Sequence, residues 1–416
     1  MKKNAKKDTE NNAGATEESL VRVLISGAGN INIEKESDES FKVVVDKSLQ
    51  IEDKTFTALE EAKKHANTLL YKQLGRKFEK SIRSENLVLL TGAGASMECG
   101  GPSMLGLWKI VSEDTSITTD WSSLLTSAGY APEIGKENLE DLLSRLQTLT
   151  RAHKINSSGT DFENVIEKIE AKILEECKKV QIGDNSSHIR FISRILKGRS
   201  ASSPRLKVFT LNYDTAFEQT GDKIKAVVLD GFLLSKNFKS VEFDLDIVQR
   251  ERSRIHNEEN FYSKVFQLYK MHGSVDWDSS GEVIQKNETP TKPTLIYPNS
   301  SKFERSFEMP FFEMVSRLQS VLRKENTTLF VVGYGFGDEH VNRIIGEALK
   351  NNLNLEIFIV KPNLQDISLH NYIEKIEKGS MNIHLIGNTF DELSTGVPDV
   401  KIGEHLLEEE KNEKPI

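Results

Sequence analysis

Short, nearly continuous apolar runs recur along most of the chain and alternate with amphipathic stretches. Runs of this kind are typical of strands that are covered on both faces of a sheet. The stretches between several of them have the three-to-four-residue spacing of helices. This alternation predicts an open α/β fold with a mainly parallel sheet. The runs are Leu87–Leu90, Leu206–Leu211, Ala226–Leu229, Phe266–Met271, Leu329–Val332, Leu355–Val360 and Ile383–Ile386.

Two segments depart from this alternation and predict separate parts of the fold. Before the first run, Val21–Ile25 and Phe41–Val45 are rich in branched residues and predict strands, and an apolar stripe over residues 59–82 predicts one long helix. Residues from about 105 to 200 carry only helical stripes, one of them preceded by Asn138 as an expected N-cap. We therefore predict a helical lobe inserted into the sheet domain.

These patterns give a domain plan. We expect residues 18–83 to form a small unit of β-strands and a long helix, and residues 84–395 to form the main domain with the helical insert at about 105–200. Residues 1–17 and 405–416 are polar and have no period, which predicts disordered ends, and residues 396–416 are expected to form a C-terminal tail.

Composition and charge exclude several classes of protein. The 416 residues include 63 acidic and 55 basic side chains, for a net charge of −8, so nucleic-acid binding by this chain alone is not expected. No apolar run approaches the roughly 20 residues that span a bilayer, and the first 17 residues lack the apolar core of a secretory signal. We therefore expect a cytoplasmic protein. Its two cysteines cannot build a four-thiolate zinc site, and we expect neither zinc nor another metal.

The strongest chemical signal is a glycine-rich turn directly after the first apolar run. Gly92-Ala93-Gly94-Ala95-Ser96 could bring backbone N–H groups close to a pyrophosphate, although it could also be only a tight turn. Met97 stands where a dinucleotide fingerprint would place a third glycine, which disfavours an ordinary dehydrogenase. A similar segment, residues 26–30, is not followed by a helix, and we interpret it as a hairpin turn.

Polar residues end two further strands. Asn212 and Asp214 follow the second run, at the edge where open α/β sheets bind ligands, but they could instead cap the helix that starts near Thr215. His272 and Gly273 follow the run Phe266–Met271; a single histidine is usually structural, yet this position suits catalysis.

The remaining signals follow the last three runs. Gly333-Tyr334-Gly335-Phe336-Gly337-Asp338 lies between a strand and an amphipathic helix and predicts a second backbone wall around one ligand. Asn363 and Phe390 follow the next two strands. Each signal is modest alone, but all of them stand at the C-terminal ends of strands.

The order of these motifs resembles the sirtuin superfamily, in its large divergent branch found among bacterial defence proteins. The resemblance covers about residues 84–395 and is carried by Gly92–Ser96, Thr210–Asp214, His272-Gly273 and Gly333–Asp338. It implies a sirtuin-type Rossmann-like domain that binds oxidised NAD.

The resemblance also implies roles for individual residues. Asn212 and His272 are the expected catalytic residues, at the nicotinamide ribose, and Asp214 would face the carboxamide of nicotinamide. The other expected NAD-binding residues are Gly92, Ala93, Gly94 and Ser96 on the pyrophosphate and adjoining ribose, and Gly333, Gly335, Asn363 and Phe390 toward the adenosine half.

Departures from the family pattern decide between activities. Protein deacylases of the family carry four cysteines for a structural zinc, and their Gly-Ile-Pro-Asp-Phe-Arg loop is replaced here by residues 101–105, Gly-Pro-Ser-Met-Leu. We therefore expect hydrolysis of NAD, as in the divergent branch, where it depletes NAD on phage infection. The alternatives are an ADP-ribosyltransferase, a non-catalytic sensor of an NAD derivative that controls assembly and, more weakly, a deacylase.

The same resemblance implies partners. An NAD-consuming activity must be restrained, so we expect a homo-oligomer or a trigger, such as a HerA-type ATPase or a phage-derived protein. The chain contains no Gly-x-x-x-x-Gly-Lys-Ser/Thr loop, so an ATP-driven step would need another chain.

Overall fold

The computed structural model describes residues 20–37, 40–46, 54–118, 120–133, 135, 137–156, 162–200, 202–249, 260–295 and 310–398. Residues 1–17 and 405–416, which were expected to be disordered, lie outside these ranges, and the expected C-terminal tail lies outside them except for residues 396–398. Contacts divide the chain into two units, one made of residues up to 75 together with 361–388, the other of 76–360 and the residues from 389 onward. The domain boundaries expected from the sequence stay a prediction.

The first unit is built on an antiparallel sheet. Each adjacent pair of its strands runs antiparallel. The expected hairpin turn joins the two strands that come first in the sequence, with the Gly29 N–H donating to the Ser26 carbonyl at 2.9 Å. Its strands, in spatial order, are β4 (Lys54–Phe56), β3 (Ser40–Val45), β2 (Ile31–Ser37), β1 (Leu20–Ser26) and β16 (Ile383–Ile386). Its helices are η7 (Ile367–Leu369), α11 (His370–Glu377) and the first part of α1 (Leu59–Ile82).

Strand β16 differs from its expected setting. It is one of the seven apolar runs that predicted parallel strands, but in the structure it pairs antiparallel with β1, with Leu24 opposite Ile386. Both strands are apolar over their paired residues, and an apolar run does not distinguish a parallel from an antiparallel neighbour.

The second unit contains the parallel sheet that the sequence predicts. The other six apolar runs form it, and every adjacent pair of strands is parallel. Strands β5 and β14 are buried at every position, as expected for strands covered on both faces. The strands in spatial order are β15 (Glu356–Val360), β14 (Thr327–Val332), β5 (Asn86–Thr91), β6 (Leu206–Thr210), β10 (Val265–Lys270) and β7 (Val227–Leu229). The predicted α/β class is confirmed.

The order of the strands marks a place for a ligand. From β5 the chain proceeds to β6, β7 and β10 on one side, and β14 and β15 then lie on the other side of β5. This reversal is a topological switch point between β14 and β5. In open α/β sheets, ligands bind outside the carboxyl ends of the strands at such a point.

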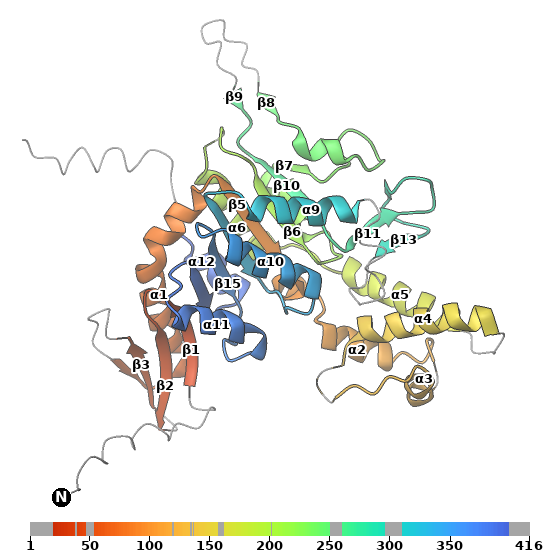
Figure 1. Cartoon of the computed structure of the whole chain (residues 1–416), viewed down its shortest axis with the longest axis horizontal. Coiled ribbons are helices and arrows are strands. Elements are labelled where there is room, and N and C mark those ends of the chain that lie inside the picture. The colour runs from red at the N-terminus through yellow and green to blue at the C-terminus, as the bar shows by residue number, and fades with distance from the viewer. Residues whose placement is uncertain are drawn as a thin grey trace, which may run out of the picture. The chain divides into compact units, whose positions relative to one another are not determined.

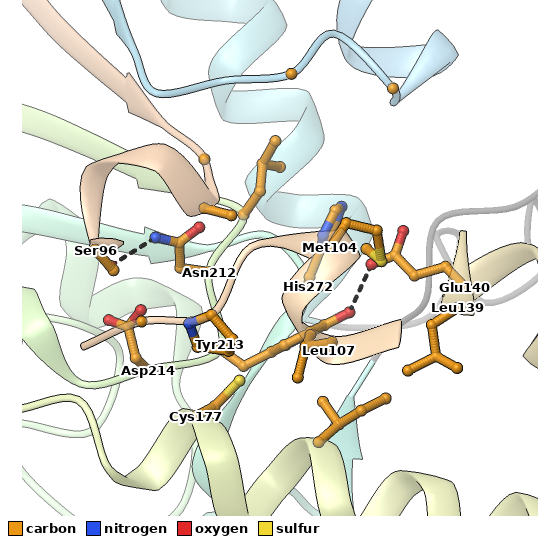
Figure 2. A pocket seen from close by; sticks show the side chains of 18 of the residues that line it. Ser96, Met104, Leu107, Leu139, Glu140, Cys177, Asn212, Tyr213, Asp214 and His272 are labelled. Carbon is orange, nitrogen blue, oxygen red and sulfur yellow. Dashed lines mark hydrogen bonds between the residues drawn. The ribbon is translucent and has the colours of Figure 1, made fainter. Parts of the chain in front are cut away.

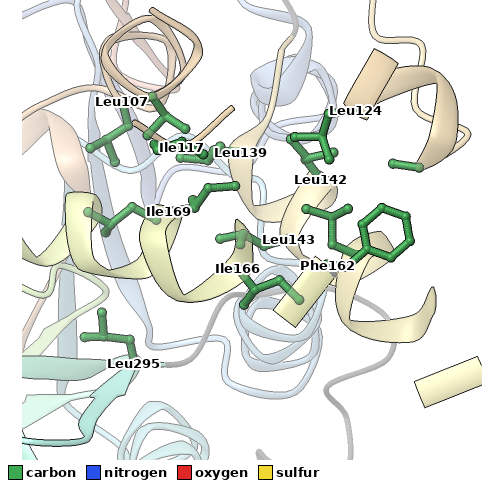
Figure 3. Close-up of a cluster of buried hydrophobic side chains, with 14 of the residues drawn as sticks. Leu107, Ile117, Leu124, Leu139, Leu142, Leu143, Phe162, Ile166, Ile169 and Leu295 are labelled. Carbon is green, nitrogen blue, oxygen red and sulfur yellow. The ribbon is translucent and has the colours of Figure 1, made fainter. Parts of the chain in front are cut away.

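In the segment that was expected to be a helical insert, the regular elements of the described residues are all helices. The first four share one buried apolar cluster (Figure 3), which also includes Tyr213, Val275 and Leu295 from the sheet domain. Asn138 is the predicted cap, since its Oδ1 accepts the backbone N–H of Glu140 at 2.9 Å. The helices are α2 (Met104–Ser112), α3 (Trp121–Ser127), α4 (Leu139–Asn156), α5 (Phe162–Lys178) and α6 (Ser187–Lys197). The name helical lobe is kept below for α2–α5.

Helix α6 belongs with the sheet. Phe191 of α6 lies with its ring centroid 5.8 Å from that of Phe330 on β14, edge to face. The helices α9 and α10 pack against each other, and α9 contacts β10 and β14 (Figure 1). The described residues of the unit also form α7 (Ala216–Ile224), α9 (Phe311–Leu322), α10 (Glu339–Asn351), α12 (Phe390–Gly396) and the short η3 (Ala93–Ala95), η4 (Met97–Cys99) and η5 (Ser240–Asp244).

Two small sheets complete the second unit. The first has the order β12 (Gln285–Lys286), β11 (Gly273–Asp278) and β13 (Pro293–Leu295), and the second pairs β8 (Val248–Gln249) with β9 (Asn260–Phe261). Within the described ranges, no helix has the length and apolar character needed to cross a membrane.

Burial of His188 in α6 predicts a dependence of stability on pH. Its ring lies edge-on to those of Phe217 and Phe390, with centroids 5.0 and 5.1 Å away. Burial lowers the pKa of His188 from 6.5 to about 4, and the charge of Asp214 opposes this shift only partly. Between these values the unfolded chain binds a proton that the folded chain does not bind, so stability decreases as the pH falls through this window.

We expect this single group to cost about 1 kcal/mol of unfolding free energy between about pH 7.5 and about pH 5.5. The variant His188→Gln cannot titrate and should lose that part of the pH dependence. His370→Gln, at an exposed position of α11, is the matched control. Urea unfolding curves at both pH values measure the effect, and equal pH slopes for His188→Gln and the wild type would contradict the prediction.

Candidate active site

The glycine-rich turn after β5 forms two short 3₁₀ turns. Gly92 leads into η3, Ser96 into η4, and the first longer helix, α2, begins only at Met104. The Gly94 N–H donates to the Gly333 carbonyl at 2.9 Å, and the Gly92 N–H donates to the Val332 carbonyl at 3.2 Å. These two N–H groups therefore join the loop after β5 to the loop after β14.

Glycine is required where these loops meet. A Cβ on Gly94 would lie 2.8 Å from the Gly333 Cα, which is closer than side chains approach a backbone. Gly333 itself has a φ of +61°, in the left-handed region that favours glycine. The sequence predicts Gly94 and Gly333 as ligand contacts, whereas in the structure each packs against the other loop.

The loops at the carboxyl ends of β5, β6, β10 and β14 line one pocket of about 260 Å³ with the helical lobe (Figure 2). Seven of the predicted site residues are among its lining residues: Gly92, Ala93, Ser96, Asn212, Asp214, His272 and Gly335. The opposite wall comes from the lobe, through Met104 and Leu107 of α2, the start of α4, and Ile173 and Cys177 of α5.

Asn212 is held in one orientation. Its side-chain amide nitrogen donates to the Ser96 hydroxyl at 2.8 Å, and its backbone N–H donates to the Thr210 hydroxyl at 3.1 Å. The residue is buried. Figure 2 shows that the amide nitrogen points toward Ser96, so the amide oxygen points away from it. That oxygen is an acceptor in a fixed position.

Asp214 combines both roles that the sequence left open. One carboxylate oxygen accepts the Ala216 N–H at 3.0 Å, at the start of α7, and the residue also lines the pocket. The loop that carries Asp214 is held by Lys270, whose side chain is only 1% exposed. The Lys270 ammonium donates to the Asp214 carbonyl and pairs with Glu218 at 3.2 Å. The sequence analysis missed Lys270 because it lies inside an apolar strand.

His272 stands between β10 and β11 and is 4% exposed. Its Nε2 lies 3.6 Å from Oδ1 of Asp338. Gly273 follows it with a φ of +91°, and a Cβ there would lie 1.9 Å from the Thr294 carbonyl oxygen. The histidine therefore needs a glycine after it for β11 to pair with β13.

Asp338 closes the glycine motif after β14 and immediately precedes α10. Burial raises its pKa to about 6, although the neighbouring His340 counteracts the shift. Its Oδ1 accepts no hydrogen bond from the part of the chain that the structure describes. The sequence analysis included Asp338 in the motif without giving it a role.

The lobe supplies pocket residues that the sequence analysis missed. The Tyr213 hydroxyl donates to Glu140 of α4 at 3.4 Å, across the pocket (Figure 2). Burial raises the pKa of the Cys177 thiol on α5 to about 12, so it is protonated at neutral pH. Periodicity marks the apolar face of a helix, and it gives no signal for a polar residue such as Glu140 in the first turn.

Four predicted residues do not line the pocket. Gly94 and Gly333 lie behind it, where the two loops meet. Phe390 is buried against His188 and Phe191. Asn363 belongs to the first unit, where its side chain accepts the Gln365 N–H at 2.9 Å. Ligand contacts of these residues stay predictions.

This geometry coincides with a family match in sequence. Residues 206–384 match the SIR2-like domain. The matched range begins with β6 and includes Asn212, Asp214, His272 and the glycine motif up to Asp338. The expected sirtuin-type resemblance is therefore shown for this part of the chain. Among curated proteins, none matches the sequence significantly.

Several solved structures of Sir2 proteins align with about four fifths of the chain at low similarity. A Sir2 homologue in complex with ADP-ribose is 12% identical, with a TM-score of 0.40 over 82% of this chain and 99% of its own. A Sir2 enzyme studied for mechanism and regulation is 14% identical, with a TM-score of 0.41 over 80% and 97%. A Sir2 homologue bound to NAD is 12% identical, with a TM-score of 0.33 over 78% and 91%.

Proposed function

We propose that the chain is an NAD hydrolase that cleaves the nicotinamide–ribose bond to give nicotinamide and ADP-ribose. The observation that carries the proposal is the convergence of Ser96, Asn212, Asp214 and His272 on one pocket at the switch point of the sheet. The match of residues 206–384 to the SIR2-like domain supports the same ligand class.

The pocket suits the reacting half of a dinucleotide. Its volume of about 260 Å³ is slightly below the range of roughly 300–1,000 Å³ of small-molecule sites. A nicotinamide and its ribose would occupy it, and the adenosine half would extend along the loop after β14. Gly335 lies on that wall and is the predicted adenosine-side residue that lines the pocket.

The chemistry requires few groups. Nicotinamide leaves as a neutral molecule from a cationic pyridinium, so the leaving group needs no proton. Water adds to the ribose carbon as the bond to nitrogen breaks, and one proton is released. The protein must therefore support an oxocarbenium-like sugar, place the water and accept that proton.

The described side chains can meet these needs. The Asn212 oxygen, fixed by the Ser96 contact, would accept a hydrogen bond from the water or a ribose hydroxyl. His272 would accept the proton. Asp214, already tied by one oxygen to the start of α7, would accept the carboxamide N–H of nicotinamide. The apolar wall from the lobe would exclude bulk water.

Turnover with product identification tests the proposal. The purified full-length chain is incubated with NAD, and nicotinamide and ADP-ribose are separated by chromatography. We expect equal amounts of both. NAD labelled in the adenosine half separates the alternatives, because a transferase would move label to a macromolecule. Tight binding of NAD without consumption would instead indicate the sensor.

Restraint and defence are part of the proposal. We propose that the lone chain is weakly active, that it acts in the cytoplasm by depleting NAD on phage infection, and that a homo-oligomer, a HerA-type ATPase or a phage-derived trigger raises its rate. Sedimentation and turnover with and without a candidate partner are the measurements. Identical mass and rate with each candidate would count against this part.

A further inference from the structure

Three side chains that could bind a metal ion lie together at the same pocket, and two of them line it. His272, Asp338 and His340 each offer one atom, and the three atoms lie within 4.8 Å of one another. The Asp338 Oδ1 lies 3.6 Å from the His272 Nε2 and 4.0 Å from the His340 Nδ1. We infer that these three side chains form a binding site for Zn²⁺, and that zinc held there inhibits the enzyme.

The spacing fits zinc closely. Zinc bonds to imidazole nitrogen and carboxylate oxygen are about 2.0–2.2 Å long, so two ligands of a tetrahedral ion stand roughly 3.4 Å apart. The two separations from Asp338 exceed this by less than 1 Å, and all three ligand atoms lie within 4.8 Å of one another. Small rotations of the side chains would close the difference.

The ligand types also favour zinc over magnesium and calcium. Two imidazoles and one carboxylate are a common zinc set with an open fourth position. Mg²⁺ and Ca²⁺ prefer oxygen ligands and are not expected to bind here. The sequence predicted no metal because its two cysteines are too few for a thiolate zinc site. Residues 272 and 338 are far apart in the sequence and come together only in the fold.

Burial makes the group a site rather than a surface cluster. Asp338 is 6% exposed and its Oδ1 accepts no hydrogen bond within the described part of the chain. A buried carboxylate oxygen without such a bond is costly, and a cation between the two rings would satisfy it. His340 is more exposed, at 36% of its side chain, which gives the ion a route from solvent.

Inhibition rests on the proposed function, because it requires His272 to act in NAD hydrolysis. The lone pair that His272 would use for the proton is the one that would bind zinc. Zinc and catalysis are therefore mutually exclusive at this residue, and NAD in the pocket should weaken zinc binding.

His340 gives a clean test, since it does not line the pocket. The full-length chain is stripped with a chelator, and Zn²⁺ binding is measured by titration calorimetry and by elemental analysis after dialysis. We expect one zinc per chain for the wild type and at least ~10-fold weaker binding for His340→Gln, since loss of even an outer partner of a ligand costs about that much. His370→Gln is the surface-histidine control, and Mg²⁺ is the metal control.

Activity supplies the second arm. We expect zinc to inhibit NAD turnover of the wild type and a chelator to restore it, whereas His340→Gln should keep its turnover and resist zinc. Equal zinc binding by the wild type, His340→Gln and a second variant, Asp338→Asn, would overturn the site. Zinc binding that depends on His340 in a chain without NAD turnover would leave the site standing and refute the proposed function instead.

Discussion

Replacing His272 with alanine is expected to lower NAD turnover by roughly 10²–10⁴-fold, which is the usual contribution of a positioned base. The imidazole is buried where β10 ends and lines the pocket, so water cannot easily take its place as a proton acceptor. Asn212→Ala should cause a loss of similar size, because it removes the fixed acceptor for the water or the ribose. The measurement is the initial rate of nicotinamide release.

The rates can be compared only if both variants are as fully folded as the wild type. Circular dichroism and thermal unfolding should show both to be folded, and His370→Gln should turn over NAD like the wild type. Ser96→Ala is a graded control: it keeps Asn212 but removes the hydroxyl that orients its amide, so we expect an intermediate rate. Unaltered turnover in both His272→Ala and Asn212→Ala would eliminate these two catalytic assignments.

The variant Gly333→Ala is expected to destabilise the second unit and to abolish NAD turnover with it. The left-handed φ of +61° alone costs a residue with a Cβ about 1–2 kcal/mol. The new Cβ would also lie 2.3 Å from the Ala95 backbone nitrogen. Backbone atoms cannot move aside like a flexible side chain, so the loop after β5 would shift and carry Ser96 away from Asn212.

Gly335→Ala is the matched control in the same loop. A Cβ there meets no atom within 4 Å, so its unfolding free energy should stay within about 0.5 kcal/mol of the wild type. Urea unfolding measures both variants, and we expect Gly333→Ala to lose at least about 2 kcal/mol. Equal stability of the two variants would show that the loops do not pack as described.

Much of the fold could be predicted because a strand that is buried on both faces appears in the sequence as a run of neighbouring apolar residues. Runs such as Leu87–Leu90 and Leu329–Val332 are apolar at every position, since helices cover both faces of the sheet. The helical lobe was equally clear from its stripes. The partner of β16 could not be predicted, because pairing depends on residues more than 350 positions apart, such as Leu24 and Ile386.

The candidate site was predictable only in part, for a similar reason. Asn212, Asp214 and His272 follow apolar runs, so their place at the carboxyl edge follows from the strands alone. Glu140 and Cys177 come from helices whose position over the pocket is a matter of tertiary packing. His340 is the second residue of α10, and only its proximity to His272 in the fold marks it as a candidate metal ligand.

Tyr213 joins the helical lobe to the pocket. Its side chain is part of the apolar cluster of α2–α5, and its neighbours in sequence are Asn212 and Asp214. Any tilt of the lobe therefore pulls on the peptide that carries both residues, with no intervening relay. A partner that bound the outer surface of α4 and moved the lobe would therefore shift Asn212 and Asp214 directly. This shift would need no change in the parallel sheet.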